Sequence, residues 1–371
     1  MAGDLSRQSP VASSRDETQP LLEGVWSAQD TTPAEIEAAL RELLTQRHAE
    51  SEDFAPARVL NLVVIADREW RGEISNRLER VGRYHPSRTI LCTVEPGRTA
   101  LDAWATMTPA SLDPEPGSIA LCHEQVVVDV GEQHLKRLDT IVDPLVVTDL
   151  ATVVWSPHGH PEAVDSLLHL AQVVLIDSVN EPDPAGAIGR ARMLAERAYV
   201  VDLAWLRSTP WRERIAATFD PPVWRGELER LSAITVRHRP DSSVAGLLFF
   251  GWLASRLGWE PGALVRQNGS LFGRARAARQ EVSLRLEPDE RQSAPGLAGI
   301  MVETASGMTL ALDRGPGGLA ARRRMRDGRE SSWTVLGASR GEAGILGEGI
   351  RQALLRDPTY RPAMDAAGAM L

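Results

Sequence analysis

Residues 59–94 read VLNLVVIADREWRGEISNRLERVGRYHPSRTILCTV, and their apolar pattern indicates a strand, a helix and a second strand. The two apolar runs, Val59–Ala66 and Thr89–Val94, have the length of buried strands. Between them, apolar residues at helical spacing mark one side of a helix: Ile74, Leu78 and Val81. Strands joined by a helix run parallel, and strand twist favours a right-handed crossover. The stretch therefore predicts a βαβ unit.

The same alternation continues as far as residue 200. Further apolar runs of strand length are Val126–Val130, Ala151–Trp155 and Val173–Asp177. Helical patterns follow these or lie between them, at about Glu132–Ile141, Pro161–Leu170 and Ala185–Ala198. Alternating strands and helices are typical of α/β domains. Residues 31–200 are therefore predicted to form an α/β domain with a mostly parallel sheet.

The N-terminal residues differ in composition from this domain. Residues 1–30 are rich in Ser, Asp, Gln, Pro and Arg and hold few large apolar side chains, so they are predicted to be a disordered tail. Order is predicted to begin with a helix at residue 33. Thr32 and Glu35 have the spacing of a capping box, and Pro33 fits the first helical position.

Beyond residue 200 the pattern changes. The sequence predicts a helix up to Phe219, a strand at Leu231–His238 and an apolar helix at Ser242–Leu257 that Gly258 ends. Four later runs alternate like strands with one covered face: Glu281–Glu287, Ile300–Thr304, Thr309–Asp313 and Ser332–Leu336. Gly315–Gly318 and the arginines at 322–324, 326 and 329 are predicted to form an exposed loop, and Ile345–Leu355 a closing helix. Helical signal is weak after Asp357. Residues 201–371 are therefore predicted to be a Trp-rich segment followed by an α+β domain with an antiparallel sheet.

Composition excludes several classes of function. The chain has 371 residues and a net charge of −9, which argues against a general binder of nucleic acids or anionic membranes. No apolar run approaches the ~18 residues of a membrane span and no signal peptide is visible, so a cytoplasmic protein is expected. Lys136 is the only lysine, which leaves little room for Schiff-base or P-loop chemistry. Cys92 and Cys122 lie in strand-like runs and are predicted to be buried free thiols, with a redox pair as the alternative.

No motif of a common catalytic or nucleotide site is present. The turn after the first strand, Asp67–Trp70, lacks the glycines that bring a backbone close to a pyrophosphate, so no dinucleotide cofactor is expected. The best small-molecule candidate is Ser156–His160, a loop that follows a strand and carries His158 and His160. Two histidines at this spacing suit a metal ion or a phosphate, but no third ligand is evident. An exposed polar loop is the alternative, and no catalytic residue or metal is assigned.

Tryptophan is concentrated in one part of the chain. Five of the ten tryptophans fall within residues 202–259. Each would forgo roughly 4–6 kcal/mol of burial if left exposed, so the core or a partner must cover them. Because Trp and Arg are enriched at interface hot spots, the candidate partner-binding residues are Asp202, Trp205, Arg207, Pro210, Trp211, Arg212, Trp252 and Arg256. The sequence leaves open whether they touch a partner or form the scaffold beneath the contact.

The order of these blocks resembles a known family. Residues 209–212 read TPWR, residues 219–222 read FDPP, and residues 250–259 read FGWLASRLGW. Together with Asp202-Leu203 and Trp205, they are similar to the OpcA family of bacterial glucose-6-phosphate dehydrogenase assembly proteins. Earlier stretches at 61–64, 85–88, 143–145, 153–155 and 174–178 extend the similarity, which covers about residues 30–260.

The resemblance implies a protein without catalytic activity or cofactor. Members of the family bind glucose-6-phosphate dehydrogenase, favour its active oligomer and raise its activity, which supports NADPH production in the oxidative pentose phosphate pathway. We therefore expect an assembly factor and allosteric activator of that enzyme. The alternative is a small-molecule enzyme or sensor that binds a phosphorylated metabolite at the His158–His160 loop.

Overall fold

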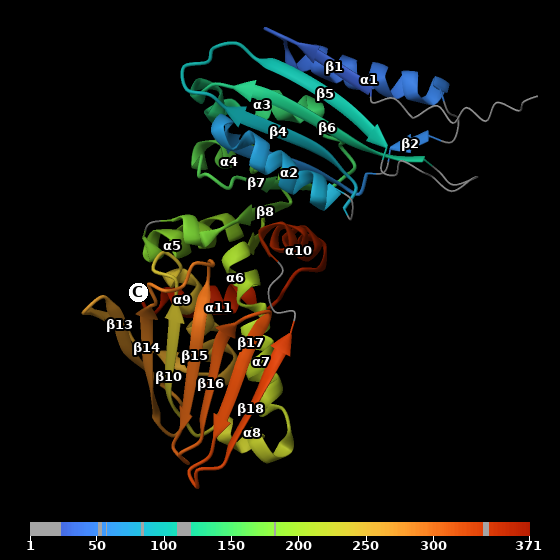
Figure 1. The fold of residues 1–371 in the computed structure, drawn as a ribbon. Coiled ribbons are helices and arrows are strands. Elements are labelled where there is room, and N and C mark those ends of the chain that lie inside the picture. The colour runs from blue at the N-terminus through green and yellow to red at the C-terminus, as the bar shows by residue number, and fades with distance from the viewer. Residues whose placement is uncertain are drawn as a thin grey trace, which may run out of the picture.

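The computed structural model describes residues 24–50, 54–56, 58–82, 85–109, 120–181, 183–336 and 341–371. They form two sheets of nine strands each, which lie one above the other in Figure 1. The upper sheet holds β1–β9 and is mostly parallel, and the lower sheet holds β10–β18 and is mostly antiparallel. This confirms the fold class predicted from the sequence. None of the helices in these residues has both the length and the apolar character needed to cross a bilayer.

The predicted βαβ unit forms the centre of the upper sheet. It consists of β3 (Leu60–Asp67), α2 (Arg71–Gly82) and β4 (Ser87–Val94), and its two strands pair in parallel. The strand order is β1-β5-β6-β4-β3-β7-β8-β9, with the short β2 (Phe54–Pro56) beside β6. The other parallel strands are β6 (Ala120–Val130), β7 (Thr152–Trp155), β8 (Val173–Ile176) and β9 (Tyr199–Asp202). Their inward residues make a continuous apolar core.

Four strands of this sheet were not predicted, and two of them are the short strands β2 and β9 described above. β1 (Gly24–Ala28) and β5 (Asp102–Pro109) pair antiparallel at its edge. The prediction of disorder is therefore wrong for residues 24–28. The polar composition of residues 1–30 as a whole hid the short segment GVWSA, which pairs with β5 through backbone hydrogen bonds. Residues 1–23 lie outside the described residues. The capping box at α1 (Pro33–Glu50) is confirmed: the Thr32 amide donates to Glu35 Oε2 at 2.8 Å, and the Glu35 amide donates to Thr32 Oγ1 at 3.3 Å.

Helices cover both faces of the upper sheet (Figure 1). The predicted helix at 132–141 is broken into η2 (Glu132–Arg137), α3 (Asp139–Val142) and η3 (Asp143–Leu145). The other crossovers are α4 (Pro161–Leu167) and α5 (Pro184–Ala195), with the short η1 (Arg68–Trp70) after β3 and η4 (Ser178–Asn180) after β8. The Trp-rich segment then gives α6 (Leu203–Arg207), α7 (Thr209–Phe219) and α8 (Pro222–Leu228).

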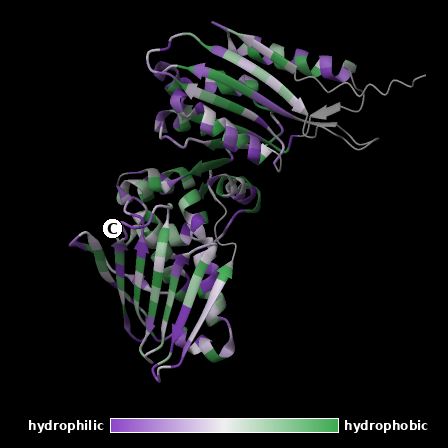
Figure 2. Ribbon diagram, in the orientation of Figure 1, coloured by the Kyte–Doolittle hydropathy of each residue, from purple (hydrophilic) through white to green (hydrophobic). Residues whose placement is uncertain are grey.

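The lower sheet has the order β11-β13-β14-β10-β15-β16-β17-β18, with β12 beside β13. Its strands are β10 (Leu231–His238), β11 (Glu260–Pro261), β12 (Val265–Gln267), β13 (Ser270–Arg276), β14 (Glu281–Pro288), β15 (Leu297–Thr304), β16 (Thr309–Gly315), β17 (Gly318–Arg324) and β18 (Glu330–Leu336). Hydrophobic and hydrophilic bands succeed one another along these strands in Figure 2, as expected for a sheet with one covered face. Arg322–Arg324 lie in β17, so the predicted exposed loop is wrong for these residues.

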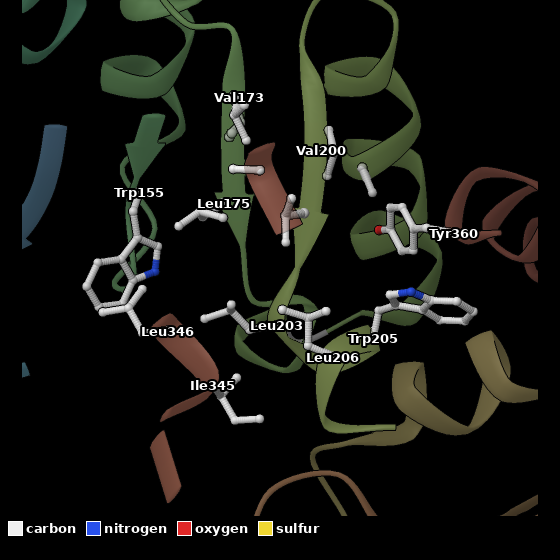
Figure 3. Packing of buried hydrophobic residues seen from close by; sticks show 14 of the residues in the cluster. Trp155, Val173, Leu175, Val200, Leu203, Trp205, Leu206, Ile345, Leu346 and Tyr360 are labelled. Atoms are coloured by element: carbon white, nitrogen blue, oxygen red, sulfur yellow. The ribbon is translucent and has the colours of Figure 1, made fainter. Parts of the chain in front are cut away.

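Three helices join the two sheets. α9 (Ser243–Leu257), ended by the left-handed Gly258 as predicted, packs on β10 and β14. α11 (Tyr360–Gly368) packs closely against α9, and α10 (Gly341–Leu355) contacts α2, α6 and β9 of the upper half. Figure 3 shows Leu346 of α10 next to Trp155 of β7, and Tyr360 of α11 next to Trp205 of α6. The C-terminal helices therefore complete a core that the upper sheet begins.

Candidate functional site

The strand order of the upper sheet reverses between β3 and β7, where open α/β sheets bind ligands. The loops that leave these strands carry Asp67 and the predicted histidine pair. His160 Nε2 lies 2.9 Å from Asp67 Oδ1, and the His158 ring lies 5.4 Å from the Trp70 ring. Side chains of the chain itself therefore bridge the crevice.

This loop geometry does not suit a pyrophosphate. The residues after β3 turn directly into η1, with Asp67 extended at φ −63° and no glycine. His160 adopts a left-handed φ of 52° just before α4, a conformation that the contact with Asp67 helps to hold. Burial lowers the pKa of His158, which as a neutral ring accepts a 3.4 Å hydrogen bond from the Asp67 amide. Within the described ranges no group of three or more candidate metal ligands occurs.

Two cavities lie beside the crevice. A cavity of about 480 Å³ runs between α4 and α5, over the carboxyl end of β8. A second, of about 330 Å³, opens between the upper sheet and α10. The two share Pro157, His158 and Asp177. Trp155 lines the smaller one, and its buried indole N–H has no hydrogen-bond partner among the described residues.

Asp202 ends β9 and is almost fully buried. Its carboxylate accepts hydrogen bonds from the Ala204 amide at 2.9 Å and from Ser178 Oγ at 2.7 Å. Tyr360 of α11 also donates to it, at 3.2 Å. Burial raises the pKa of Asp202 to about 6. Asp202 thus caps α6 and ties it to the loop after β8 and to the C-terminal helix.

Trp205 and Arg212 form a second buried unit. The Arg212 guanidinium lies 3.4 Å from the centre of the Trp205 ring, a cation–π contact. Trp205 Nε1 donates to Asp357 at 2.8 Å, and its ring packs on Tyr360 at 5.6 Å (Figure 3). Burial lowers the pKa of Arg212 to about 10, while Asp357, 4.0 Å away, opposes that shift. The Trp–Arg pair is therefore core packing.

Arg207 joins three parts of the molecule. Its two terminal nitrogens donate to both oxygens of Asp177, at 2.8 and 2.7 Å, and one of them also donates to Glu342 at 2.6 Å. Asp177 follows β8, Arg207 ends α6 and Glu342 begins α10. The guanidinium therefore holds the upper sheet, the Trp-rich segment and the C-terminal helices in one arrangement.

The other candidate residues differ in exposure. Trp211 is buried under the lower sheet, with the Arg314 guanidinium 5.9 Å from its ring. Pro210 lies in the first turn of α7 and is half-buried. Trp252 is half-buried on α9, 5.5 Å from the Phe249 ring, and Arg256 is exposed. Of the two roles that the sequence left open, the buried residues have the geometry of a scaffold, whereas Trp252 and Arg256 reach the surface.

Sequence reasoning did not assign a role to four residues of this junction. Asp177, Glu342, Asp357 and Tyr360 complete the contacts of Asp202, Trp205 and Arg207. Three of them lie between 135 and 158 residues from their partners. No local pattern connects such positions, so only the fold brings them together.

Two family models match the chain. One is described as the glucose-6-phosphate dehydrogenase subunit N-terminal domain and matches residues 78–193. The other is described as the C-terminal domain of the same subunit and matches residues 198–364. The boundary between them, at residues 194–197, falls just before the start of β9.

Curated relatives bear the name "Putative OxPP cycle protein OpcA". The chain is 28% identical to the protein of Synechococcus elongatus over 186 residues, which is 49% of this chain and 40% of the relative. The protein of Nostoc punctiforme is also 28% identical, over 156 residues, covering 41% of this chain and 34% of the relative. The matches thus span less than half of the length of these relatives.

Solved structures whose backbones partly resemble this one are oxidoreductases, and their sequence identity to this chain is low. A 3-ketoreductase from Actinomadura kijaniata has a TM-score of 0.47 and 13% identity, covering 84% of this chain and 95% of that one. The apo scyllo-inositol dehydrogenase of Lactobacillus casei has a TM-score of 0.41 and 14% identity, covering 85% of this chain and 96% of that one. The family models, in contrast, match well over half of the chain. The chain therefore belongs to the OpcA family of glucose-6-phosphate dehydrogenase assembly proteins.

Proposed function

We propose that this protein is a non-catalytic assembly factor and allosteric activator of glucose-6-phosphate dehydrogenase. It binds the enzyme directly, favours its active oligomer and so raises NADPH production in the oxidative pentose phosphate pathway. No cofactor takes part. The observation that carries the proposal is the pair of family models, which together match residues 78–193 and 198–364 and name a subunit of that enzyme.

The geometry at the sheet supports a role without catalysis. The crevice between β3 and β7 is bridged by Asp67 and His160 and walled by the Trp70–His158 contact. A dinucleotide bound in the usual place would have to break both contacts. The loop after β3 also has no glycine that would let a backbone approach a phosphate.

We propose that the activator works by differential binding. It must bind the active state of the enzyme more tightly than the inactive state, and about 3 kcal/mol of difference shifts the equilibrium more than a hundredfold. The proposed contact includes Trp252 and Arg256, which lie four residues apart on the same side of α9. The buried residues Asp202, Trp205, Arg207, Trp211 and Arg212, with the half-buried Pro210, hold that helix in place.

The test uses purified enzyme and purified activator. We expect the rate of the dehydrogenase and its content of active oligomer to rise together, and to saturate, as this protein is added. Arg256→Glu is expected to weaken the activation, because it reverses an exposed charge at the proposed contact. Arg137→Glu, an exposed arginine in η2 of the upper half, is the matched control and should activate like the wild type.

Two results would contradict the proposal. One is a dehydrogenase whose rate and oligomeric state stay unchanged at saturating activator. The other is turnover of a metabolite by this protein alone. If activation occurs but Arg256→Glu matches the control, the activator role stands and the contact lies elsewhere.

A second candidate function rests on the two cavities. A sensor of a phosphorylated metabolite would bind beside His158, where the unpartnered Trp155 N–H offers a hydrogen-bond donor. Changing both His158 and His160 to Ala separates the two hypotheses. Activation that survives this change favours the assembly factor, whereas loss of a measured affinity for glucose 6-phosphate favours the sensor.

A further inference from the structure

The cavity of about 330 Å³ lies at the junction of the two halves of the molecule, and we call it the junction cavity. Its wall comes from segments that are far apart in the sequence: Trp155 ends β7, Leu203 begins α6, Arg239 follows β10 and Leu346 lies in α10. The volume is at the lower end of the range for small-molecule sites, so the cavity suits a ligand of single-ring size.

Two N–H groups of the wall have no acceptor among the described residues. Trp155 is 1% exposed, and its indole N–H is buried without a partner. In Figure 3 the indole nitrogen is on the side of the ring that faces Leu203, another residue of the wall. His158 accepts the Asp67 amide at Nδ1, so the neutral ring carries its proton at Nε2 and can donate there. Because buried donors are almost always paired, the indole N–H points to an acceptor supplied by a ligand.

The charges of the wall are balanced. Three arginines and three carboxylates line the cavity, and His158 is neutral: Arg77, Arg207 and Arg239, with Glu73, Asp177 and Glu342. Each of these arginines already forms an ion pair with a carboxylate of the chain. An anionic ligand would have to displace one of those carboxylates and leave it without its cation, which is costly in a partly buried space. A neutral ligand leaves every ion pair intact.

Trp70 supplies a flat apolar surface where the cavity meets the solvent. It lines the cavity and is 42% exposed, so a ligand can reach its indole from outside. The buried Leu203 and Leu346 add apolar wall inside. The carbon-bound hydrogens of a sugar or cyclitol ring pack on an indole face, while its hydroxyl groups both donate and accept hydrogen bonds. This combination of surfaces matches such a ring.

From these features we infer that the junction cavity binds a neutral sugar or cyclic polyol. Hydroxyl oxygens of the ligand accept from Trp155 and His158, its ring packs on Trp70, and a further hydroxyl group donates to Glu73. The ligand differs in charge from the phosphorylated metabolite of the sensor hypothesis, and its binding does not depend on the dehydrogenase. Because it contacts both halves of the folded chain, it stabilises their junction.

Calorimetric titration of the full chain tests the ligand class with three probes: glucose, myo-inositol and glucose 6-phosphate. We expect at least one neutral probe to bind at one site per chain, with a dissociation constant of about 1 mM or below. Glucose 6-phosphate should bind at least about tenfold more weakly than the better neutral probe, because its phosphate has no unpaired arginine to contact.

Two variants test the place of binding. Trp155→Phe removes the indole N–H and keeps a ring in the core, so it should weaken binding of the neutral probe about tenfold. Trp70→Ala removes the exposed aromatic surface and should weaken binding as well, whereas Trp70→Phe should restore most of it. Since Trp70 is partly exposed, its variants keep the test independent of folding, which thermal unfolding confirms.

The matched control is Trp224→Phe, the same substitution at a half-buried tryptophan of α8, at the far end of the lower sheet (Figure 1). It should bind the neutral probe like the wild type. The inference fails if neither neutral probe binds at about 10 mM, a concentration well above the expected dissociation constant. It also fails if Trp155→Phe and Trp70→Ala bind as well as the control. Tighter binding of glucose 6-phosphate than of both neutral probes would overturn the ligand class and favour the sensor instead.

Discussion

Asp202 is a carboxyl group that holds three segments together from inside the core. It receives hydrogen bonds from α6, from the loop after β8 and from Tyr360 of α11. The acid is short enough to cap a helix, and its burial raises its pKa to about 6. Both properties follow from its position at the carboxyl end of β9, beneath α11.

Asp202 predicts a specific pH dependence of stability. The pKa of Asp202 is raised to about 6 in the folded chain. Its contribution to the free energy of unfolding is therefore complete below about pH 4 and is lost as the pH rises through 6. The shift of about 2 units corresponds to about 3 kcal/mol. Asp202→Asn cannot ionise and should lose that part of the dependence between pH 4 and 6. Urea unfolding at a series of pH values measures it.

The matched control for this experiment is Asp220→Asn, whose side chain is 84% exposed. It should keep the pH dependence of the wild type. If the free energy of unfolding of Asp202→Asn parallels that of the wild type over the whole range, the buried carboxyl group does not titrate as proposed.

Cys92 is a second residue whose burial decides its chemistry. It is fully buried in β4, and burial raises the pKa of its thiol to about 12. The prediction of a buried free thiol is confirmed for Cys92, while the side chain of Cys122 lies outside the described residues. Since the thiolate is the reactive form, we expect a Cys122→Ser variant to resist iodoacetamide while folded and to react once urea unfolds it. Stoichiometric labelling of the folded variant would show that Cys92 is accessible.

Among the elements, α9 and α11 make the closest packing of two helices. A Cβ on Gly251 of α9 would lie 1.9 Å from the Ala363 carbonyl oxygen, which is backbone and has no room to move aside. Gly251 therefore sets the distance between the helices. The weak helical signal after Asp357 becomes a full helix because this contact buries Ala363, Met364 and Ala367.

A pair of glycine substitutions tests this packing. Gly251→Ala should destabilise the chain by several kcal/mol, because the helices must separate to admit the methyl group. Gly189→Ala in α5 adds the same methyl group where nothing lies within 4 Å, so it should stabilise by about 0.5–1 kcal/mol through helix propensity. Chemical unfolding of both variants gives the comparison. Similar effects of the two substitutions would mean that α9 and α11 are loosely packed.

At the scale of the whole molecule, Arg207 connects the halves. Its side chain is 7% exposed and that of Asp177 is 9% exposed, so water screens their contact little. Glu342 is 38% exposed and should contribute less. The three residues come from three elements, and the geometry of the junction depends on all of them.

Removing Arg207 and removing Arg256 should have opposite consequences. Arg207→Ala leaves Asp177 buried without its cation, which should destabilise the chain by about 3–5 kcal/mol. Activation of the dehydrogenase should then fall only as far as the folded fraction falls. Arg256→Ala should leave the unfolding transition unchanged and reduce activation. Thermal unfolding and activation, measured on the same samples, distinguish a scaffold residue from a contact residue. If Arg207→Ala is as stable as the wild type, the junction does not depend on this ion pair.

The sequence by itself determined much of the secondary structure. Periodicity, caps and breakers are local, so the βαβ unit, the capping box of Thr32 and Glu35, and the end of α9 at Gly258 were all predictable. The edge strand β1 was missed because its stability comes from pairing with β5, some 80 residues away. The resemblance of the Trp-bearing blocks identified the family, since the order of the motifs does not depend on their packing.

The tertiary structure alone decided what those blocks do. Arg207 meets Asp177 and Glu342 across 30 and 135 residues of chain, and Trp205 meets Asp357 across 152. Burial also separates Trp205 and Trp211, which pack in the core, from Arg256, which faces water. Exposure and long-range pairing are properties of the folded chain as a whole. A sequence pattern limited to neighbouring residues does not contain them.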